Sequence, residues 1–319
     1  MTNPAEVTIA TRGSRLAIAQ SKIVEALLKK AHPALVVRLE VVTTTGDRDQ
    51  RGFAAIGGKG LFTSEVERAV VEGRADLAVH SAKDLTSELA AGCSLICIPA
   101  RAPVYDVVLG GTGSTGEERL AALPPGARVG TSSMRRRTLL EEARPDVEAV
   151  EFRGNLDTRL RKVAEGEVEG AVVAAAGLLR LGHRDLAPLD PERWVPAPAQ
   201  GALAVEARAE RADLAELFAG LDDPTARAEV TCERAFSEGL QGGCSIPLGC
   251  LAAARDGGLV ASGYLGSPFG GDSLRDRISG PMTEAAVLGA ELADAILRAG
   301  GDEVVAEVRA SAPTEVPAP

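Results

Sequence analysis

The stretch VTIATRGSRLAIAQSKIVEALLKK, residues 7–30, determines what kind of fold the chain can adopt. Its first residues, Val7–Thr11, are apolar or β-branched and predict a buried strand. The polar turn TRGS follows, and Arg15–Lys30 carries apolar residues at helical spacing, with Ser14 as the expected N-cap. A strand that passes through a short turn into a helix is the unit from which α/β domains are built.

The same unit recurs along the first 200 residues, which predicts an α/β fold made of two similar lobes. We expect residues 1–102, with a return segment at 200–221, to form the first lobe and residues 103–199 to form the second. The segment WVPAPAQGALAVEAR, residues 194–208, is punctuated by proline and suits a chain that crosses back between lobes. Residues 222–319 predict a smaller C-terminal α+β domain, with strands on either side of the turn Asp256-Gly257-Gly258.

Composition limits the class of protein. The chain has 319 residues, 45% of them hydrophobic and 25% charged, which is typical of a globular protein with two or three domains. No apolar run approaches the roughly 20 residues of a membrane span, and the polar start lacks a signal core, so we expect a cytoplasmic protein without membrane contact. The net charge of −10 argues against a nucleic-acid partner. Five cysteines and three histidines show no ligand spacing, so we expect neither a disulfide framework nor a metal site.

Positive charge is nevertheless concentrated in one region. Residues 128–162 contain nine basic and six acidic side chains, within a protein that is acidic as a whole. A local basic site can bind a small anion without making the whole surface attractive to polyanions. This region therefore predicts a small anionic ligand.

Three predicted junctions between a strand and a helix carry arginines next to Ser, Thr or Asn. They are TRGSR (11–15), GTSSMRRR (130–137) and RGNLDTR (153–159). Unpaired N–H groups at a helix start and the forked arginine side chain both bind carboxylates or phosphates. One such junction alone could be a solvated helix face, but three in equivalent places favour a polyanion site.

The motif VHSAKDL, residues 79–85, places Ser81, Lys83 and Asp84 directly after a buried strand. Lys83 and Asp84 could form a structural ion pair. The alternative is functional: the carboxylate stabilises a developing cation and transfers protons, while the ammonium binds an anionic group.

One cysteine differs from the other four. Cys244 follows two glycines in GGCS (242–245), which permits exposure and close approach, whereas the others lie in apolar or helical sequence. No histidine is near it in the sequence to act as a base. Covalent attachment of a group through sulfur is therefore a better hypothesis for Cys244 than protease-like catalysis.

Taken together, these motifs resemble the porphobilinogen deaminase family of tetrapyrrole biosynthesis. The resemblance spans nearly the whole chain and includes TRGSRLAIAQ (11–20), GGKGLF (57–62), AVHSAKDL (78–85), VGTSSMRRR (129–137), FRGNLDTRL (152–160), AAAGLLRLG (174–182), AQGALAVE (199–206), CERAF (232–236) and GGCSIPLG (242–249). It implies two α/β lobes like those of bilobal solute-binding proteins, a smaller C-terminal α+β domain, and an active cleft between the lobes.

The resemblance also implies an activity and a cofactor. The family consists of transferases, also called hydroxymethylbilane synthases, which condense four porphobilinogen molecules head to tail with release of ammonia and then release linear hydroxymethylbilane by hydrolysis. The primer is one covalently bound dipyrromethane cofactor, held here by a thioether to Cys244. Each pyrrole carries an acetate and a propionate, which accounts for the arginines. We expect a monomer.

Site residues follow from the matching motifs. Asp84 is the expected catalytic carboxylate. The residues expected to hold the cofactor are Cys244, Lys59, Ser81, Lys83, Thr131, Ser132, Ser133, Arg135, Arg136, Asn155 and Arg159. Those expected to bind substrate are Arg12, Ser14, Phe62, Arg153, Arg159, Arg180 and Gln200.

Some positions depart from the family pattern, namely Ala82, Thr86, Ala199 and Val104-Tyr105. None is a charged group assigned to the site, so we expect them to affect packing more than chemistry. Two alternatives remain, a low-activity paralogue and a non-enzymatic bilobal protein that binds a polycarboxylate. In the second of these Cys244 would carry no modification.

Overall fold

A computed structural model describes residues 5–42, 64–86, 89–242 and 246–311. The contacts divide the chain into two compact units. Of the described residues, the first unit contains 5–42, 64–86, 89–102 and 201–227, and the second contains 103–200, 228–242 and 246–311. The chain thus passes between the units next to Ala102, next to Gln200, and within the long helix α10 (Pro224–Gly239).

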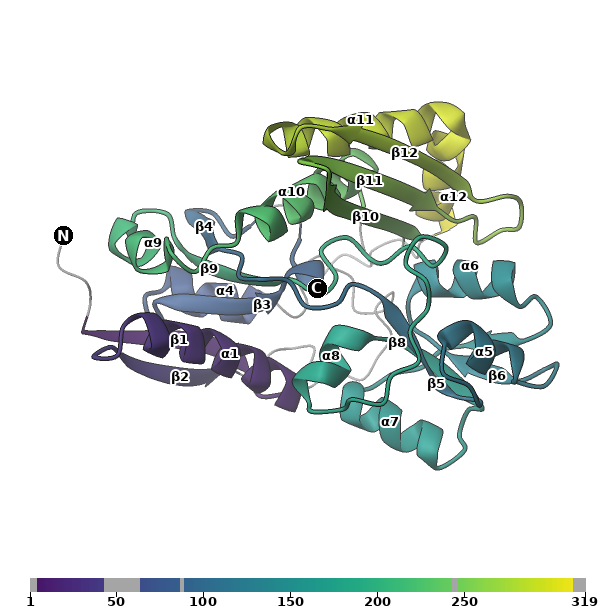
Figure 1. Cartoon of the computed structure of the whole chain (residues 1–319), viewed down its shortest axis with the longest axis horizontal. Helices are drawn as coiled ribbons and strands as arrows, with labels where there is room; N and C mark the ends of the chain where they lie inside the picture. The colour runs from purple at the N-terminus through teal and green to yellow at the C-terminus, as the bar shows by residue number, and fades with distance from the viewer. Residues whose placement is uncertain (1–4, 43–63, 87–88, 243–245, 312–319) are drawn as a thin grey trace, which may run out of the picture. The chain divides into compact units, whose positions relative to one another are not determined.

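The first unit contains a five-stranded sheet (Figure 1). Strand β1 is parallel to β2 and β3, whereas β9 is antiparallel to β3 and β4. In order across the sheet the strands are β2 (Val36–Val42), β1 (Glu6–Arg12), β3 (Leu77–Ser81), β9 (Leu203–Arg208) and β4 (Cys93–Cys97).

Helices cover both faces of this sheet. On one face α1 (Arg15–Ala31) and α9 (Ala212–Phe218) pack on Leu77 and Val79, and on the other α4 (Ser64–Val71) packs on Ala78. Because side chains alternate along a strand, β3 is buried on both sides and ends where the chain leaves the sheet at Ser81.

The second unit contains a four-stranded sheet and, after it, a three-stranded one. In the four-stranded sheet β6 is parallel to β7 and β8, and β5 is antiparallel to β8. Its strands, in order, are β5 (Asp106–Gly110), β8 (Gly170–Ala174), β6 (Arg128–Gly130) and β7 (Glu148–Val150). Its helices are α5 (Gly116–Ala121), α6 (Met134–Ala143), α7 (Leu156–Ala164) and α8 (Ala175–Arg180).

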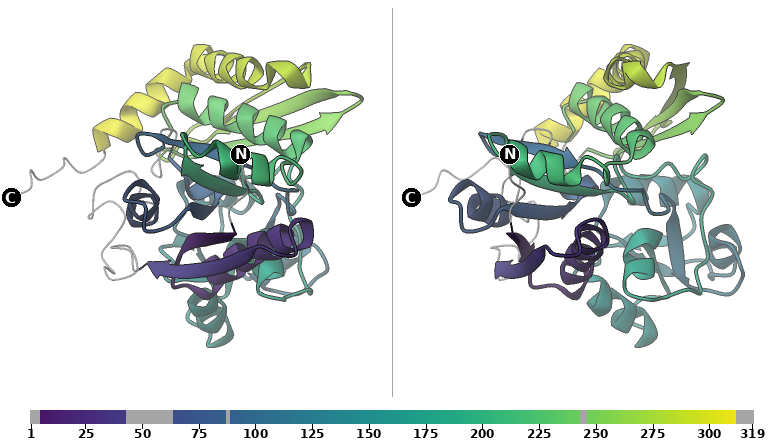
Figure 2. Two further views of the ribbon diagram at one scale, coloured as in Figure 1. Left: turned by 90° about the vertical axis from the view of Figure 1, so that its left-hand side faces the viewer. Right: turned by 60° about the vertical axis from the view of Figure 1, so that its left-hand side comes forward.

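The three-stranded sheet is antiparallel, and α11 runs along it (Figure 2). Its core joins Phe236 and Leu240, at the end of α10, to Leu288 and Leu292 of α11. The elements after α10 are β10 (Leu248–Arg255), β11 (Gly258–Leu265), β12 (Leu274–Gly280), the turn Met282–Glu284, α11 (Ala285–Ile296), the turn Leu297–Gly301 and α12 (Asp302–Ser311).

The expected fold class is confirmed: two α/β sheets are followed by an α+β part. The turn expected at Asp256-Gly257 is present, with φ of 51° and 79°, as a two-residue hairpin turn requires. The run AVVAAA (171–176) on its own predicts a strand to Ala176, and this boundary is wrong. Strand β8 ends at Ala174 and α8 begins at Ala175, because AAAGLLR consists mostly of good helix formers.

Ala199 has a φ of 60°, in the left-handed region that costs a residue with a Cβ atom about 1–2 kcal/mol. We expect Ala199→Gly to raise the free energy of unfolding by about 1 kcal/mol, because glycine adopts this conformation freely. Urea unfolding measures the change. Asp256, with a φ of 51°, provides the matched control. Asp256→Gly should gain less stability, since Asp tolerates positive φ. An unchanged or lower midpoint for Ala199→Gly would contradict the expectation.

Candidate active site

The polar residues of VHSAKDL lie where β3 ends in the first unit. Ser81 is the last residue of the strand, and Ala82–Asp84 form one 3₁₀ turn after it. The Gln20 side-chain amide of α1 donates a hydrogen bond of 2.5 Å to the Ser81 hydroxyl, which ties the strand end to the helix. Asp84 is exposed and Lys83 is half-buried, so the turn presents a carboxylate outward from a rigid sheet.

A pocket lies at this strand end and brings together four of the predicted site residues. Its polar lining consists of Arg12, Ser14, Gln20, His80, Ser81 and Asp84. Ser14 caps α1 by accepting a hydrogen bond of 3.2 Å from the Ala17 backbone N–H, as the sequence predicts. The pocket therefore combines a guanidinium group and a helix N-terminus, which suit a carboxylate, with the exposed Asp84 carboxylate, which suits a cation.

Two members of this lining, Gln20 and His80, were not predicted. Gln20 looks like one more helix residue in the sequence, and His80 looks like part of a buried strand. The sequence does contain a hint for His80, because a polar residue within the mostly apolar strand LAVHS needs a partner or a function. Its partner is Glu206 on β9, 2.9 Å away, which is 126 residues distant in sequence.

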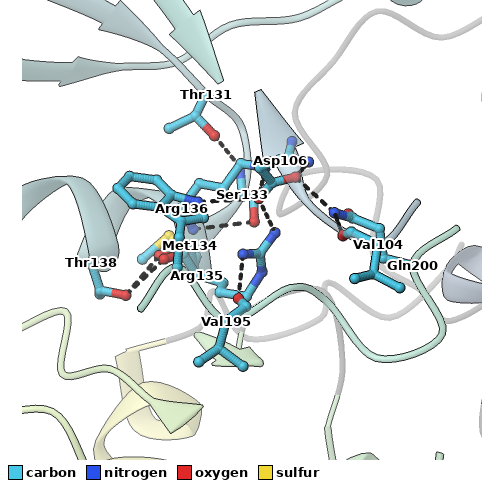
Figure 3. Close-up of polar contacts among 11 residues, drawn as sticks. Val104, Asp106, Thr131, Ser133, Met134, Arg135, Arg136, Thr138, Val195 and Gln200 are labelled. Atoms are coloured by element: carbon cyan, nitrogen blue, oxygen red, sulfur yellow. Dashed lines mark hydrogen bonds and ion pairs between the residues drawn. The ribbon is translucent and has the colours of Figure 1, made fainter. Parts of the chain in front are cut away.

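In the second unit, the side chain of Asp106 is the centre of a buried hydrogen-bond network (Figure 3). Its Oδ2 atom accepts from Arg135 Nη2 at 2.8 Å, from Arg136 Nε at 3.1 Å and from the Trp194 indole at 3.2 Å. Its Oδ1 atom accepts from Arg136 Nη2 at 2.7 Å and from the Gln200 amide at 2.8 Å. Asp106 thus joins the start of β5, helix α6 and the segment that ends at Gln200.

The charges in this network do not cancel. Burial alone would raise the pKa of Asp106, but the charges and hydrogen bonds of Arg136 and Arg135 lower that pKa far below its ordinary 3.8. Two guanidinium groups face one carboxylate, which leaves a net positive charge. Arg135 Nε is also buried without a hydrogen-bond partner among the described residues. One donor of Arg135 is therefore not used by the described residues.

The structure changes how three predicted residues are understood. The family resemblance implies that Arg135, Arg136 and Gln200 contact ligand carboxylates. In the structure, Arg135 and Arg136 are 3% and 6% exposed, and both donate hydrogen bonds to Asp106. Arg135 also donates to the Val195 carbonyl, and Gln200 donates to Asp106 and to the Val104 carbonyl. Sequence reasoning missed Asp106 because the pairing is long-range. Contact of these three residues with a ligand stays a prediction.

The other predicted residues of this unit lie at the carboxyl ends of β6, β7 and β8, which share one edge because these strands are parallel. Ser133 and Asn155 are the N-caps of α6 and α7. After β6, Ser132 donates to the Phe152 carbonyl at 2.6 Å and Thr131 Oγ1 accepts from the Ser133 N–H at 3.2 Å.

Three further arginines lie at the same edge. Arg153 pairs with Glu151 at 2.9 Å, Arg159 Nε donates to the Gly154 carbonyl at 3.0 Å, and Arg180 ends α8. All three are half-buried, so they are more accessible than Arg135 and Arg136.

Lys59, Phe62 and Cys244 lie outside the described residues. Within the part that is described, no group of three or more His, Cys, Asp or Glu side chains is arranged to hold a metal ion. None of the described helices is both long and apolar enough to span a bilayer.

Replacing Asp106 by Asn removes the negative charge that two buried guanidinium groups share, and we expect it to cost about 3–5 kcal/mol of stability at pH 7. Because the pKa of Asp106 is lowered on folding, its contribution is fully present above the ordinary pKa of 3.8 and is lost only as the pH falls below it. The difference in the free energy of unfolding between wild type and Asp106→Asn should therefore stay constant from about pH 5 to 8 and become smaller in stronger acid.

The measurement is chemical unfolding at each pH. Asp213→Asn is a matched control, because Asp213 pairs with Arg211 at 2.8 Å with both side chains about a quarter exposed, and such pairs contribute about 1 kcal/mol or less. If Asp106→Asn loses no more free energy of unfolding than Asp213→Asn, the network does not stabilise the fold as proposed.

Comparison with known proteins agrees with this arrangement. The family model described as "Porphobilinogen deaminase, dipyromethane cofactor binding domain" matches residues 7–216, and the one described as "Porphobilinogen deaminase, C-terminal domain" matches residues 227–298. The chain is 46% identical over 303 residues to the porphobilinogen deaminase of Roseiflexus castenholzii, covering 94% of this chain and 98% of that protein. It is 45% identical over 302 residues to that of Stenotrophomonas maltophilia, with the same coverage.

Similar solved structures include a Bordetella pertussis BvgS VFT2 domain, with a TM-score of 0.40, 16% identity and coverage of 67% of this chain and 84% of that one. The methionine binding protein MetQ has a TM-score of 0.41 and 11% identity, and the match covers 69% of this chain and 89% of MetQ. Since two family models together match most of its length, and relatives above 40% identity match it nearly end to end, the chain belongs to the porphobilinogen deaminase family.

Proposed function

We propose that this protein is a hydroxymethylbilane synthase. It condenses four porphobilinogen molecules head to tail with release of ammonia, on a dipyrromethane primer attached to Cys244, and then hydrolyses off the linear hydroxymethylbilane. The observation that carries the proposal is the match of both family domains, the first of them described by the cofactor it binds. A cytoplasmic monomer without a nucleic-acid partner is part of the same proposal.

The donor groups of the described residues fit such a cofactor. A dipyrromethane of this kind carries four carboxylates, and the edge formed by β6, β7 and β8 offers guanidinium groups, hydroxyls and two capped helix N-termini. The buried Arg135 Nε, which lacks a protein partner among the described residues, agrees with a further acceptor there. When bound, the cofactor supplies the pyrrole carbon to which the first substrate is joined.

We assign the cofactor carboxylates to Ser81, Lys83, Thr131, Ser132, Ser133, Asn155 and Arg159. The buried side chains of Arg135 and Arg136 would add positive potential to this site. Arg12 and Ser14 of the first unit, with Arg153 and Arg180 of the second, would bind the acetate and propionate of porphobilinogen. Arg12 and Ser14 line the same pocket as Asp84, so a substrate carboxylate bound to them would bring its pyrrole ring near the Asp84 side chain.

Asp84 would stabilise the charge that develops as ammonia leaves porphobilinogen. Departure of ammonia makes the substrate electron-poor, and the positive charge is shared by its pyrrole nitrogen. A fixed carboxylate that lies near this nitrogen lowers the energy of that state more than the energy of the neutral substrate. The rigid turn Ala82–Asp84, anchored by β3, keeps the carboxylate in place.

Intact mass spectrometry tests the covalent attachment. We expect the purified wild type to exceed its sequence mass by two condensed pyrrole units and Cys244→Ser to lack the excess. Cys93→Ser is the matched control and should keep it, because burial and the Glu206 charge raise the pKa of Cys93 to about 12, which leaves little reactive thiolate. An unmodified wild type would count against the enzyme and favour a protein that only binds polycarboxylates.

Asp84→Asn removes the charge without changing the size of the side chain. We expect the variant to keep its adduct and to lose turnover by about 10²-fold or more, because an uncharged amide no longer stabilises the cation. Formation of linear tetrapyrrole from porphobilinogen measures it. Asp84→Glu should retain more turnover than Asp84→Asn, since it keeps the negative charge. Near-normal turnover in Asp84→Asn would refute the assigned role.

A further inference from the structure

His80 and Glu206 form a buried pair on one face of the first unit's sheet. Ala78 of β3 pairs with Glu206 of β9, so His80, two residues along, is its diagonal neighbour on the same face. The distance from His80 Nε2 to Glu206 Oε2 is 2.9 Å, and the two side chains are 4% and 0% exposed. Because a carboxylate oxygen only accepts hydrogen bonds, His80 Nε2 carries the hydrogen, and Nδ1 is the ring nitrogen left to accept a proton.

Other charged and titratable groups surround this pair. Helix α4 places the buried Glu67 on this face, β4 contributes Cys93, and Arg208 follows on β9, while the pocket contributes Arg12 and Asp84. Burial raises the pKa of Cys93 most, and the charge of Glu206 and a side-chain hydrogen bond to Glu206 raise it further. His80 is thus a single imidazole among several carboxylates and two arginines.

The pair is poorly suited to a purely structural role. Glu206 Oε1 is fully buried and accepts no hydrogen bond from a nitrogen or oxygen atom of the described residues, and its neighbour Cys93 offers only a thiol, which is a weak donor. Burying a polar pair costs solvation that only complete hydrogen bonding offsets, and apolar side chains of similar size hold a sheet together equally well or better. A buried pair that is incompletely hydrogen-bonded needs another explanation.

The position of His80 suggests that explanation, because His80 is among the residues that line the same pocket as Asp84, Arg12 and Ser81. Among side chains, imidazole exchanges a proton most readily near neutral pH. Each condensation releases one proton, from the pyrrole carbon that forms the new bond. Asp84 is needed as a negative charge beside the cation, so a second group in the pocket is suited to share the proton transfer by taking this proton.

We propose that His80 Nδ1 accepts the proton released at each condensation, while Glu206 holds the imidazole in the tautomer that leaves Nδ1 free to do so. The proposal rests on the function proposed above. A carbon–carbon bond forms between the free α-carbon of a pyrrole ring and the methylene carbon that has lost ammonia. The carbon–hydrogen bond at that α-carbon then breaks, and its electron pair restores the aromatic ring. The proton moves to Nδ1, the imidazolium is stabilised by Glu206, and the proton passes to solvent before the next cycle.

The first test uses the wild-type protein and does not depend on turnover. The chain has only three histidines, His32, His80 and His183, so protein labelled with ¹⁵N-histidine gives three imidazole spectra. The spectrum missing from His80→Asn identifies His80. We expect His80 at neutral pH to show a protonated Nε2 and an unprotonated Nδ1, and Glu206→Gln to disturb this pattern. A neutral His80 with the hydrogen on Nδ1 would overturn the proposal.

The second test follows the proton itself. With porphobilinogen deuterated at its free α-carbon, we expect His80→Asn to lower kcat by about 10²-fold and to show a larger isotope effect than wild type, because loss of the α-proton becomes rate-limiting. KM and the mass of the covalent adduct should stay unchanged. Glu206→Gln should have the same effects to a smaller degree. His32→Asn is the matched control, because His32 bonds through Nε2 to the Leu217 carbonyl and does not line the pocket, and it should behave as wild type.

The outcomes separate the two proposals. A folded His80→Asn with unchanged kcat and isotope effect would overturn the role of His80 while leaving the synthase intact. If His80→Asn does not fold, the kcat and isotope effect of Glu206→Gln and the His80 tautomer in the wild-type spectra test the role of His80 instead. A wild type that forms no tetrapyrrole would refute the proposed function instead, and the tautomer measurement would still report on the Glu206–His80 pair.

Discussion

The second unit depends on one buried anion, the carboxylate of Asp106. It is fully inaccessible, yet five hydrogen bonds reach its two oxygens from α6, from Trp194 and from Gln200. A carboxylate is stable in such a place only when charge and hydrogen bonds replace its hydration. The same bonds hold two adjacent arginines of α6 inside the protein. Asp106 therefore sets the direction of α6, and with it the position of the N-terminus that Ser133 caps.

This arrangement divides the arginines of the basic region into two kinds. Arg135 and Arg136 are committed to Asp106 and supply a fixed positive potential, whereas Arg153 and Arg159 are half-buried and can contact a ligand directly. Fixed charges in a dry environment need no reorganisation when an anion arrives. The more accessible arginines would be available to the polycarboxylate that the proposed reaction lengthens. A growing polycarboxylate is suited to a site that offers both.

The parts that sequence predicts well are those defined by local periodicity and by motif. The Ser14 cap, α1 and the first turn of α6 follow from neighbouring residues, and Arg12, Ser14, Ser81 and Asp84 come from motifs and meet in one pocket. Strand β4 was not predicted, because Cys93–Cys97 has little alternation of exposure. Asp106, Gln20 and Glu206 were also missed. Their partners lie 29 to 126 residues away, and no pattern in a single sequence reports which side chains meet across a sheet.

In the first unit, two carboxylates that differ in burial are suited to different roles. Asp84 and Glu206 are both acidic, and both belong to elements that continue or pair with β3. Asp84 stands exposed on a turn, where its charge can act on a substrate, while Glu206 is enclosed and forms its hydrogen bond with His80. An exposed carboxylate can approach a developing cation directly, because no protein group covers it. An enclosed one orients an imidazole, because that hydrogen bond replaces part of the solvation it has lost. One strand end can thus supply both a stationary negative charge and a base.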